Sequence, residues 1–116
     1  MKFIIKGRLP ALNDYTKVNR GNKYAGNNLK KNTQQLISLF IPKEPVNTPI
    51  RLIFSWYEPN KRRDKDNIAF AKKFILDALV NAGVIPNDGW KEIEGFEDRF
   101  YVDKKDPRVE VELLQI

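Results

Sequence analysis

Histidine and cysteine are both absent from this chain of 116 residues. Their absence excludes Ser-His-Asp triads, Cys-His pairs, imidazole bases and zinc sites built from His or Cys. Any catalytic chemistry must therefore come from Asp, Glu, Lys, Arg, Tyr or a bound hard metal ion. A lack of cysteine is also typical of cytoplasmic proteins, and we expect this protein in the cytoplasm.

Long hydrophobic runs are missing as well. No apolar stretch is long enough to cross a bilayer, and we expect no membrane association. The opening segment MKFIIKGRLP has only three consecutive apolar residues, which is too short for a signal peptide and favours a first strand. With 41% hydrophobic and 31% charged residues, the chain is typical of a globular protein, and we expect one domain over residues 1–116.

The net charge of +6 is distributed unevenly. Residues 1–60 contain 10 Lys/Arg against 3 Asp/Glu, a net charge of +7, whereas residues 61–116 contain 11 against 12, a net charge of −1. A basic surface favours polyanionic partners, and nucleic acid is the first candidate. The competing interpretation is a basic protein whose charge only confers solubility.

Hydrophobic patterning predicts an α+β fold, in which a small mixed β-sheet carries two packed helices. Residues 50–57, IRLIFSWY, predict a strand in the middle of the sheet, and RVEVELLQI alternates between apolar and charged residues as a half-buried strand does. Apolar residues at helical spacing predict helices over 28–40 and 67–82, the second ending at Gly83. With strands over 2–8 and 92–102, the element order is β-α-β-α-β-β.

Residues 9–28, LPALNDYTKVNRGNKYAGNN, are rich in Asn and Gly and predict a long loop. It contains both cations and aromatic residues, a combination that suits phosphates and unstacked bases. The candidate DNA-binding cations of this segment are Lys17, Arg20 and Lys23, with Tyr15 before them and Tyr24 after them. A flexible surface loop without a ligand explains the same composition.

The segment KRRDKDNI, residues 61–68, places two aspartates among four cations. Asp64 and Asp66 are separated by one residue, so in an extended chain their carboxylates lie on the same side. Such a pair suits Mg²⁺ or Mn²⁺, because magnesium sites use one or two carboxylates and complete their coordination with water and phosphate. Lys61, Arg62, Arg63 and Lys65 would suit that phosphate, and Asp88 offers a third carboxylate. The alternative is a solvated turn in which Asp64 or Asp66 caps a helix.

The same residues resemble the RusA-type crossover junction endodeoxyribonucleases, a family common in prophages. The resemblance lies in an R-x-D-x-D-N turn, a helix with K-x-x-x-D-A-L, an A-G-V ending, a following aspartate and an opening P-x-x-N-x-Y. In this chain the matching residues are Pro10, Asn13, Tyr15, Asp64, Asp66, Asn67, Lys73, Asp77, Ala78, Leu79, Ala82, Gly83 and Asp88. One departure is the insertion IAF, nearly a helical turn, before AKKF, so Lys72 competes with Lys73 as the family's lysine.

The resemblance implies a homodimer that binds four-way DNA junctions, a form of branched DNA, and makes paired nicks in opposing strands. It implies that Asp64, Asp66 and Asp88 hold Mg²⁺, with Mn²⁺ as an alternative, and that Lys73 stabilises the transition state or positions the phosphate. The alternative for Lys73 is a surface lysine paired with Asp77 at i, i+4, and we expect Asp77 to orient a neighbour or cap local structure. Lys72 joins the candidate DNA contacts. A catalytically silent module that binds branched DNA through the same basic surface is the alternative function.

Asp88 poses a geometric question. An unbroken helix over residues 67–82 is about 24 Å long, whereas residues 83–88 span at most about 17 Å. Asp88 therefore reaches Asp66 only if the chain doubles back along the helix, if the helix starts later, or if Asp88 comes from the dimer partner. We expect the chain to double back within one subunit.

Overall fold

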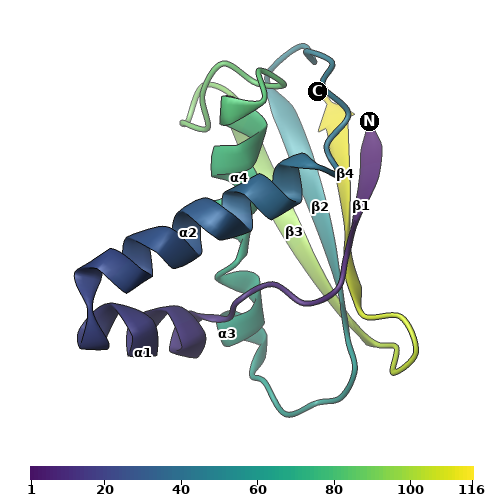
Figure 1. Cartoon of the computed structure of the whole chain (residues 1–116). Coiled ribbons are helices and arrows are strands. Elements are labelled where there is room, and N and C mark those ends of the chain that lie inside the picture. The colour runs from purple at the N-terminus through teal and green to yellow at the C-terminus, as the bar shows by residue number, and fades with distance from the viewer.

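A four-stranded mixed sheet carries all of the helices on one face in the computed structural model, which describes residues Met1–Ile116 (Figure 1). This arrangement confirms the predicted α+β class. The elements in chain order are β1 (Lys2–Lys6), α1 (Leu12–Gly21), α2 (Lys23–Ser38), β2 (Ile50–Glu58), α3 (Lys65–Ala69), α4 (Lys72–Asn81), β3 (Ile93–Val102) and β4 (Arg108–Gln115).

The strand order β1-β4-β2-β3 places β2 inside the sheet, as its apolar sequence predicted. Strand β2 pairs antiparallel with β4 and parallel with β3, so that Trp56 lies opposite Phe100 and Glu58 opposite Val102. Because parallel strands end at the same edge of a sheet, the loop after β2 emerges beside the end of β3. This loop, residues 59–64, contains Asp64 and leads to Asp66 in the first turn of α3. We call residues 59–66 the aspartate loop.

The core fills the space between the sheet and the helices. Alternate residues of β2, including Leu52, Phe54 and Trp56, are buried against this side. Helix α4 contributes Phe74, Ile75 and Leu79 among other buried side chains. At roughly 25 cal/mol for each Å² of apolar surface removed from water, this shared burial is the main force that holds α4 to the sheet.

The predicted helix over residues 67–82 consists of two pieces. Helix α3 already starts at Lys65 and ends at Ala69, and α4 follows after a tight turn in which Ala71 N–H bonds to Ile68 O and Lys73 N–H to Phe70 O. Gly83 ends α4 as predicted. Its φ of 76° is left-handed, and the adjoining Val84 N–H bonds to Leu79 O over 3.0 Å.

The predicted loop over residues 9–28 is wrong, because most of it is helical. Helix α1 occupies Leu12–Gly21, and α2 follows after a single residue, Asn22, whose side-chain oxygen accepts the Tyr24 N–H over 2.8 Å. The Asn- and Gly-rich composition has low helix propensity, but tertiary contacts commonly override propensity. Here those contacts come from α3 and α4, as described below.

Helices α1 and α2 form a hairpin, the arm, which covers residues 12–38 and extends well beyond the edge of the sheet (Figure 1). No residue of α1 is buried, whereas α2 buries Gly26, Thr33 and Ile37. The arm therefore exposes most of its surface. None of the helices in the structure has the length and apolar character needed to span a membrane.

Candidate functional site

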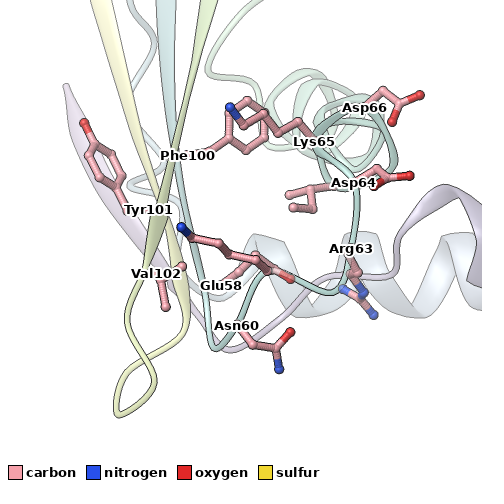
Figure 2. Close-up of a pocket in the computed structure, with 11 residues that line it drawn as sticks. Glu58, Asn60, Arg63, Asp64, Lys65, Asp66, Phe100, Tyr101 and Val102 are labelled. Atoms are coloured by element: carbon pink, nitrogen blue, oxygen red, sulfur yellow. The ribbon is translucent and has the colours of Figure 1, made fainter.

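Asp64 and Asp66 lie at the start of α3 with unusually free carboxylates. Asp64 occupies the N-cap position, where its backbone oxygen accepts the Ile68 N–H, but its side chain makes no capping hydrogen bond. The Asp66 carboxylate accepts the neighbouring Asn67 N–H over 2.9 Å. Neither carboxylate takes part in an ion pair. Both turn to the same side of the chain, away from Phe100 (Figure 2).

The cations around this pair divide into free and engaged groups. Lys61, Arg62 and Lys65 are exposed and form no ion pair, so their predicted contacts with phosphate stay a prediction that their environment permits. Arg63, in contrast, is engaged within the protein. Its guanidinium donates to Leu9 O over 3.1 Å and to the Asp14 carboxylate over 2.9 Å. The structure therefore gives Arg63 an anchoring role in place of the predicted phosphate contact.

Asn67 forms a second anchor between the same two segments. Its side-chain oxygen accepts the Asn13 N–H of α1 over 2.8 Å, satisfying a helix N-terminal donor from another element. Tyr15 adds apolar contact, with its ring centroid 5.7 Å from that of Phe70 and 6.0 Å from that of Phe74. The Pro10–Tyr15 segment and the Arg63–Asn67 segment, far apart in the sequence, are thus packed together.

Lys72 is also held inside the protein. Its ammonium pairs with Asp98 of β3 and lies 3.8 Å from the centroid of the Phe96 ring, and its side chain is only 14% exposed. The Asp98 carboxylate also accepts the Trp56 indole N–H over 2.9 Å. Lys72 therefore ties α4 to the sheet, and this environment disfavours the predicted DNA contact.

Lys73 points the other way and is 58% exposed. Its ammonium lies 3.0 Å from the Asp77 carboxylate, as the i, i+4 spacing predicted, and 3.5 Å from that of Asp88. The hydrogen bond to Asp77 raises the pKa of Lys73, and the charges of Asp77 and Asp88 add to the effect, although partial burial opposes it. Lys73 is therefore a cation at neutral pH and is suited to binding a phosphate, not to accepting a proton.

Asp77 connects two helices. Besides Lys73, its carboxylate accepts a hydrogen bond from Gln34 of α2 over 3.2 Å and lies 3.6 Å from the Lys30 ammonium. This arrangement agrees with the expectation that Asp77 orients its neighbours.

Asp88 does not join Asp64 and Asp66 within this chain. The contact with Lys73 shows that the chain doubles back along α4, as expected, but only as far as its first turn. Asp66 precedes Lys73 by seven residues and lies on α3, on the other side of the turn that separates the two helices. No three acidic side chains lie close enough together to hold a metal ion. The predicted three-aspartate centre is therefore not formed by one subunit in this conformation.

The remaining pair still fits a hard divalent cation. Magnesium sites commonly use one or two protein carboxylates and fill the other positions with water and substrate phosphate. Asp64 and Asp66 supply two unpaired carboxylates on one side of the chain, beside the free cations Lys61, Arg62 and Lys65. A two-carboxylate metal site that phosphate completes therefore stays a prediction.

The three cations of the arm that were predicted to contact DNA are exposed and free of ion pairs. Lys17 and Arg20 lie on α1, and Lys23 starts α2, so they are held on helices and not on the predicted loop. Tyr24 beside them is 79% exposed. Because the root of α1 packs against α3, the arm continues from the aspartate loop and adds to its positive charge.

Sequence patterns did not reveal a pocket of about 550 Å³ on the other side of the aspartate loop (Figure 2). It lies between the start of α3 and the ends of β2 and β3, and its lining residues are Glu58, Asn60, Lys61, Arg63, Asp64, Lys65, Asp66, Ile68, Phe100, Tyr101 and Val102. A local pattern cannot show this pocket, because the parallel pairing of β2 with β3 creates it. Asp98, the missed partner of Lys72, left a signal in the sequence, since it interrupts the apolar register of Phe96 and Phe100.

Comparison with known proteins finds no protein-family model and no curated protein that matches this chain.

Proposed function

We propose that this protein is a Mg²⁺-dependent, structure-selective endodeoxyribonuclease of the RusA type that resolves four-way DNA junctions by paired nicks. The observation that carries the proposal is the pair of unpaired carboxylates, Asp64 and Asp66, beside free cations at the start of α3. A purely structural turn in a basic segment would be expected to pair these charges. Unpaired carboxylates beside unpaired cations favour a site that binds a metal ion and a phosphate.

Each residue then has a separate task. Asp64 and Asp66 would hold Mg²⁺, which when bound activates water and offsets charge on the scissile phosphate. Lys61, Arg62 and Lys65 bind the neighbouring phosphates. Lys73 remains protonated and supplies a further positive charge along α4, stabilising charge that develops on a phosphate.

Asp66→Asn tests the proposal directly. We expect the variant to lose Mg²⁺-dependent cleavage of a synthetic four-way junction, because an amide is a poorer ligand for a hard cation. Junction binding should be retained or become tighter, since one negative charge near the phosphates is removed. Gel-based cleavage and anisotropy-based binding measure the two effects. A wild-type protein that cuts no junction, fork or flap in Mg²⁺ would disprove the proposal.

Cleavage of the same junction by Asp88→Asn distinguishes two possible roles of Asp88, metal binding and an ion pair with Lys73. Loss of cleavage as complete as that of Asp66→Asn would support a role in metal binding, with Asp88 supplied by a rearrangement or by a second subunit. A change of only a few-fold would support the role seen in the structure, an ion pair with Lys73.

The alternative, a catalytically silent module for branched DNA, is favoured by one observation: no third carboxylate accompanies Asp64 and Asp66. Under this alternative the wild type binds junctions with steep salt dependence but cleaves none. The cleavage assay described above therefore also decides between these two functions.

A further inference from the structure

The pocket behind the aspartate loop differs in character from the aspartate side. Ile68, Phe100 and Val102 supply apolar surface within it, and Phe100 is only partly buried. The Lys65 ammonium lies 5.7 Å from the centroid of the Phe100 ring, above its face. A partly open aromatic ring under a cation is a platform on which a flat heteroaromatic ring stacks well.

Charge limits what this pocket accepts. Glu58 in its lining is 8% exposed, and its carboxylate pairs with Arg8 over 2.8 Å. A buried acid that already has its cation disfavours a second anion inside, so a phosphate belongs outside the pocket. Lys61 is exposed, lines the pocket and forms no ion pair, so it is available to that phosphate. A base stacked on Phe100 would displace the exposed Lys65 ammonium from the ring and leave it for the same phosphate. The pocket therefore suits a ligand with a neutral ring inside and a phosphate outside.

A nucleotide of a DNA strand has these two parts, a neutral base and a phosphate. Asp64 and Lys65 line the pocket, while the Asp64 and Asp66 carboxylates turn away from Phe100 (Figure 2). The aspartate loop therefore separates the pocket, which suits a base, from the carboxylates, which suit the chemistry at a phosphate. Paired bases in a duplex are stacked and cannot enter, but bases at a branch point are unstacked at lower cost. This step rests on the proposed function.

We propose that this pocket receives one unstacked nucleobase of a branched DNA strand, stacked on Phe100, while the backbone of that strand crosses the aspartate loop. Recognition of branched over duplex DNA follows, because only a strand with an accessible base fills the pocket. Stacking of a base on an aromatic side chain contributes about 1–3 kcal/mol.

The test uses a set of four-way junctions, each with one 2-aminopurine at a different position around the branch point. The junctions are bound by the Asp66→Asn protein, so that they stay uncut. We expect a fluorescence increase of several-fold at one position, because unstacking from neighbouring bases relieves quenching. Adding Phe100→Leu should remove most of that increase and weaken junction binding on the order of tenfold, while duplex binding stays the same. Phe96→Leu, the same change on the same strand but outside the pocket, should leave both signals intact.

The outcomes separate the two proposals. Wild-type protein that neither binds nor cuts branched DNA overturns the proposed function and this inference together. Wild-type protein that cuts junctions while no position brightens, or while Phe100→Leu brightens equally, overturns the base pocket alone. Binding of a free deoxynucleoside monophosphate at micromolar concentration, in competition with the junction, would assign the pocket to a soluble nucleotide instead.

Discussion

Two adjacent lysines of α4 have opposite environments, although their sequence context is almost the same. Lys72 is largely buried between Asp98 and the ring of Phe96, whereas Lys73 is exposed beside Asp77 and Asp88. The helix turns about 100° per residue, so neighbouring positions face different surroundings. The difference identifies Lys73 as the lysine available to a substrate.

We expect Lys72→Met to lower the free energy of unfolding by about 2 kcal/mol, because Asp98 loses a charged hydrogen-bond partner in a partly buried site. Lys73→Met should change it by less than about 0.5 kcal/mol, since its ion pairs are near the surface. Junction cleavage should instead fall in Lys73→Met. Urea unfolding and cleavage assays on both variants test this assignment. Equal stability of the two variants would contradict it.

At the scale of the elements, α1 depends on contacts supplied by others. It buries no residue of its own, and the Asn13 N–H near its start bonds to Asn67, 54 positions away. Isolated helices of this length are marginal in water. The segment that carries the aspartates therefore helps α2 to hold α1 in place.

Asn67→Ala should lower the free energy of unfolding by about 1 kcal/mol, the usual cost of losing a helix N-terminal hydrogen bond. Circular dichroism should also show a loss of helix if α1 frays. Asn27→Ala is a matched control, because Asn27 is exposed in α2, and we expect no loss of stability there. An equal effect in the two variants would remove the role assigned to Asn67.

These dependencies also explain how far the sequence could predict the structure. The alternation in β4, the apolar run of β2 and the Gly83 ending of α4 are local signals, and the structure confirms each. Helix α1 and the Phe100 pocket depend on long-range contacts that no local pattern contains. In the site, the spacing of Asp64 and Asp66 was informative because both lie in one short segment. The position of Asp88 depended on how far the chain returns along α4.

At the scale of the whole molecule, free cations extend from the aspartate loop along the arm to its outer end, where α1 meets α2 and where Arg20 and Lys23 lie. The first 60 residues carry most of the net charge, and the free cations of the arm belong to them. Strands β2 and β3 are parallel, so Lys43 and Lys91, which precede them, lie toward the opposite edge of the sheet from residues 59–64. Removing two cations from the arm can therefore be compared with removing two cations from the far end of the sheet.

We expect Arg20→Gln with Lys23→Gln to weaken junction binding and to reduce the slope of log K against log salt by about 2, because each lost phosphate contact releases about 0.9 fewer counterions. Lys43→Gln with Lys91→Gln removes the same charge and should leave the slope nearly unchanged. Anisotropy titrations of a labelled junction over a series of KCl concentrations measure both slopes. Identical slopes for the two double variants would show that the arm does not contact DNA.

The two anchors of the arm have a mechanical consequence. Arg63 and Asn67 bracket the aspartates directly in the chain, and each is bonded to the root of α1. A hairpin fixed at its root behaves as a lever, whose long end carries Tyr24 and whose short end is the turn between Arg63 and Asn67. A force that a bound partner applies to the outer end is therefore shared between the residues beside the two carboxylates and the contacts of α2 with Asp77 of α4.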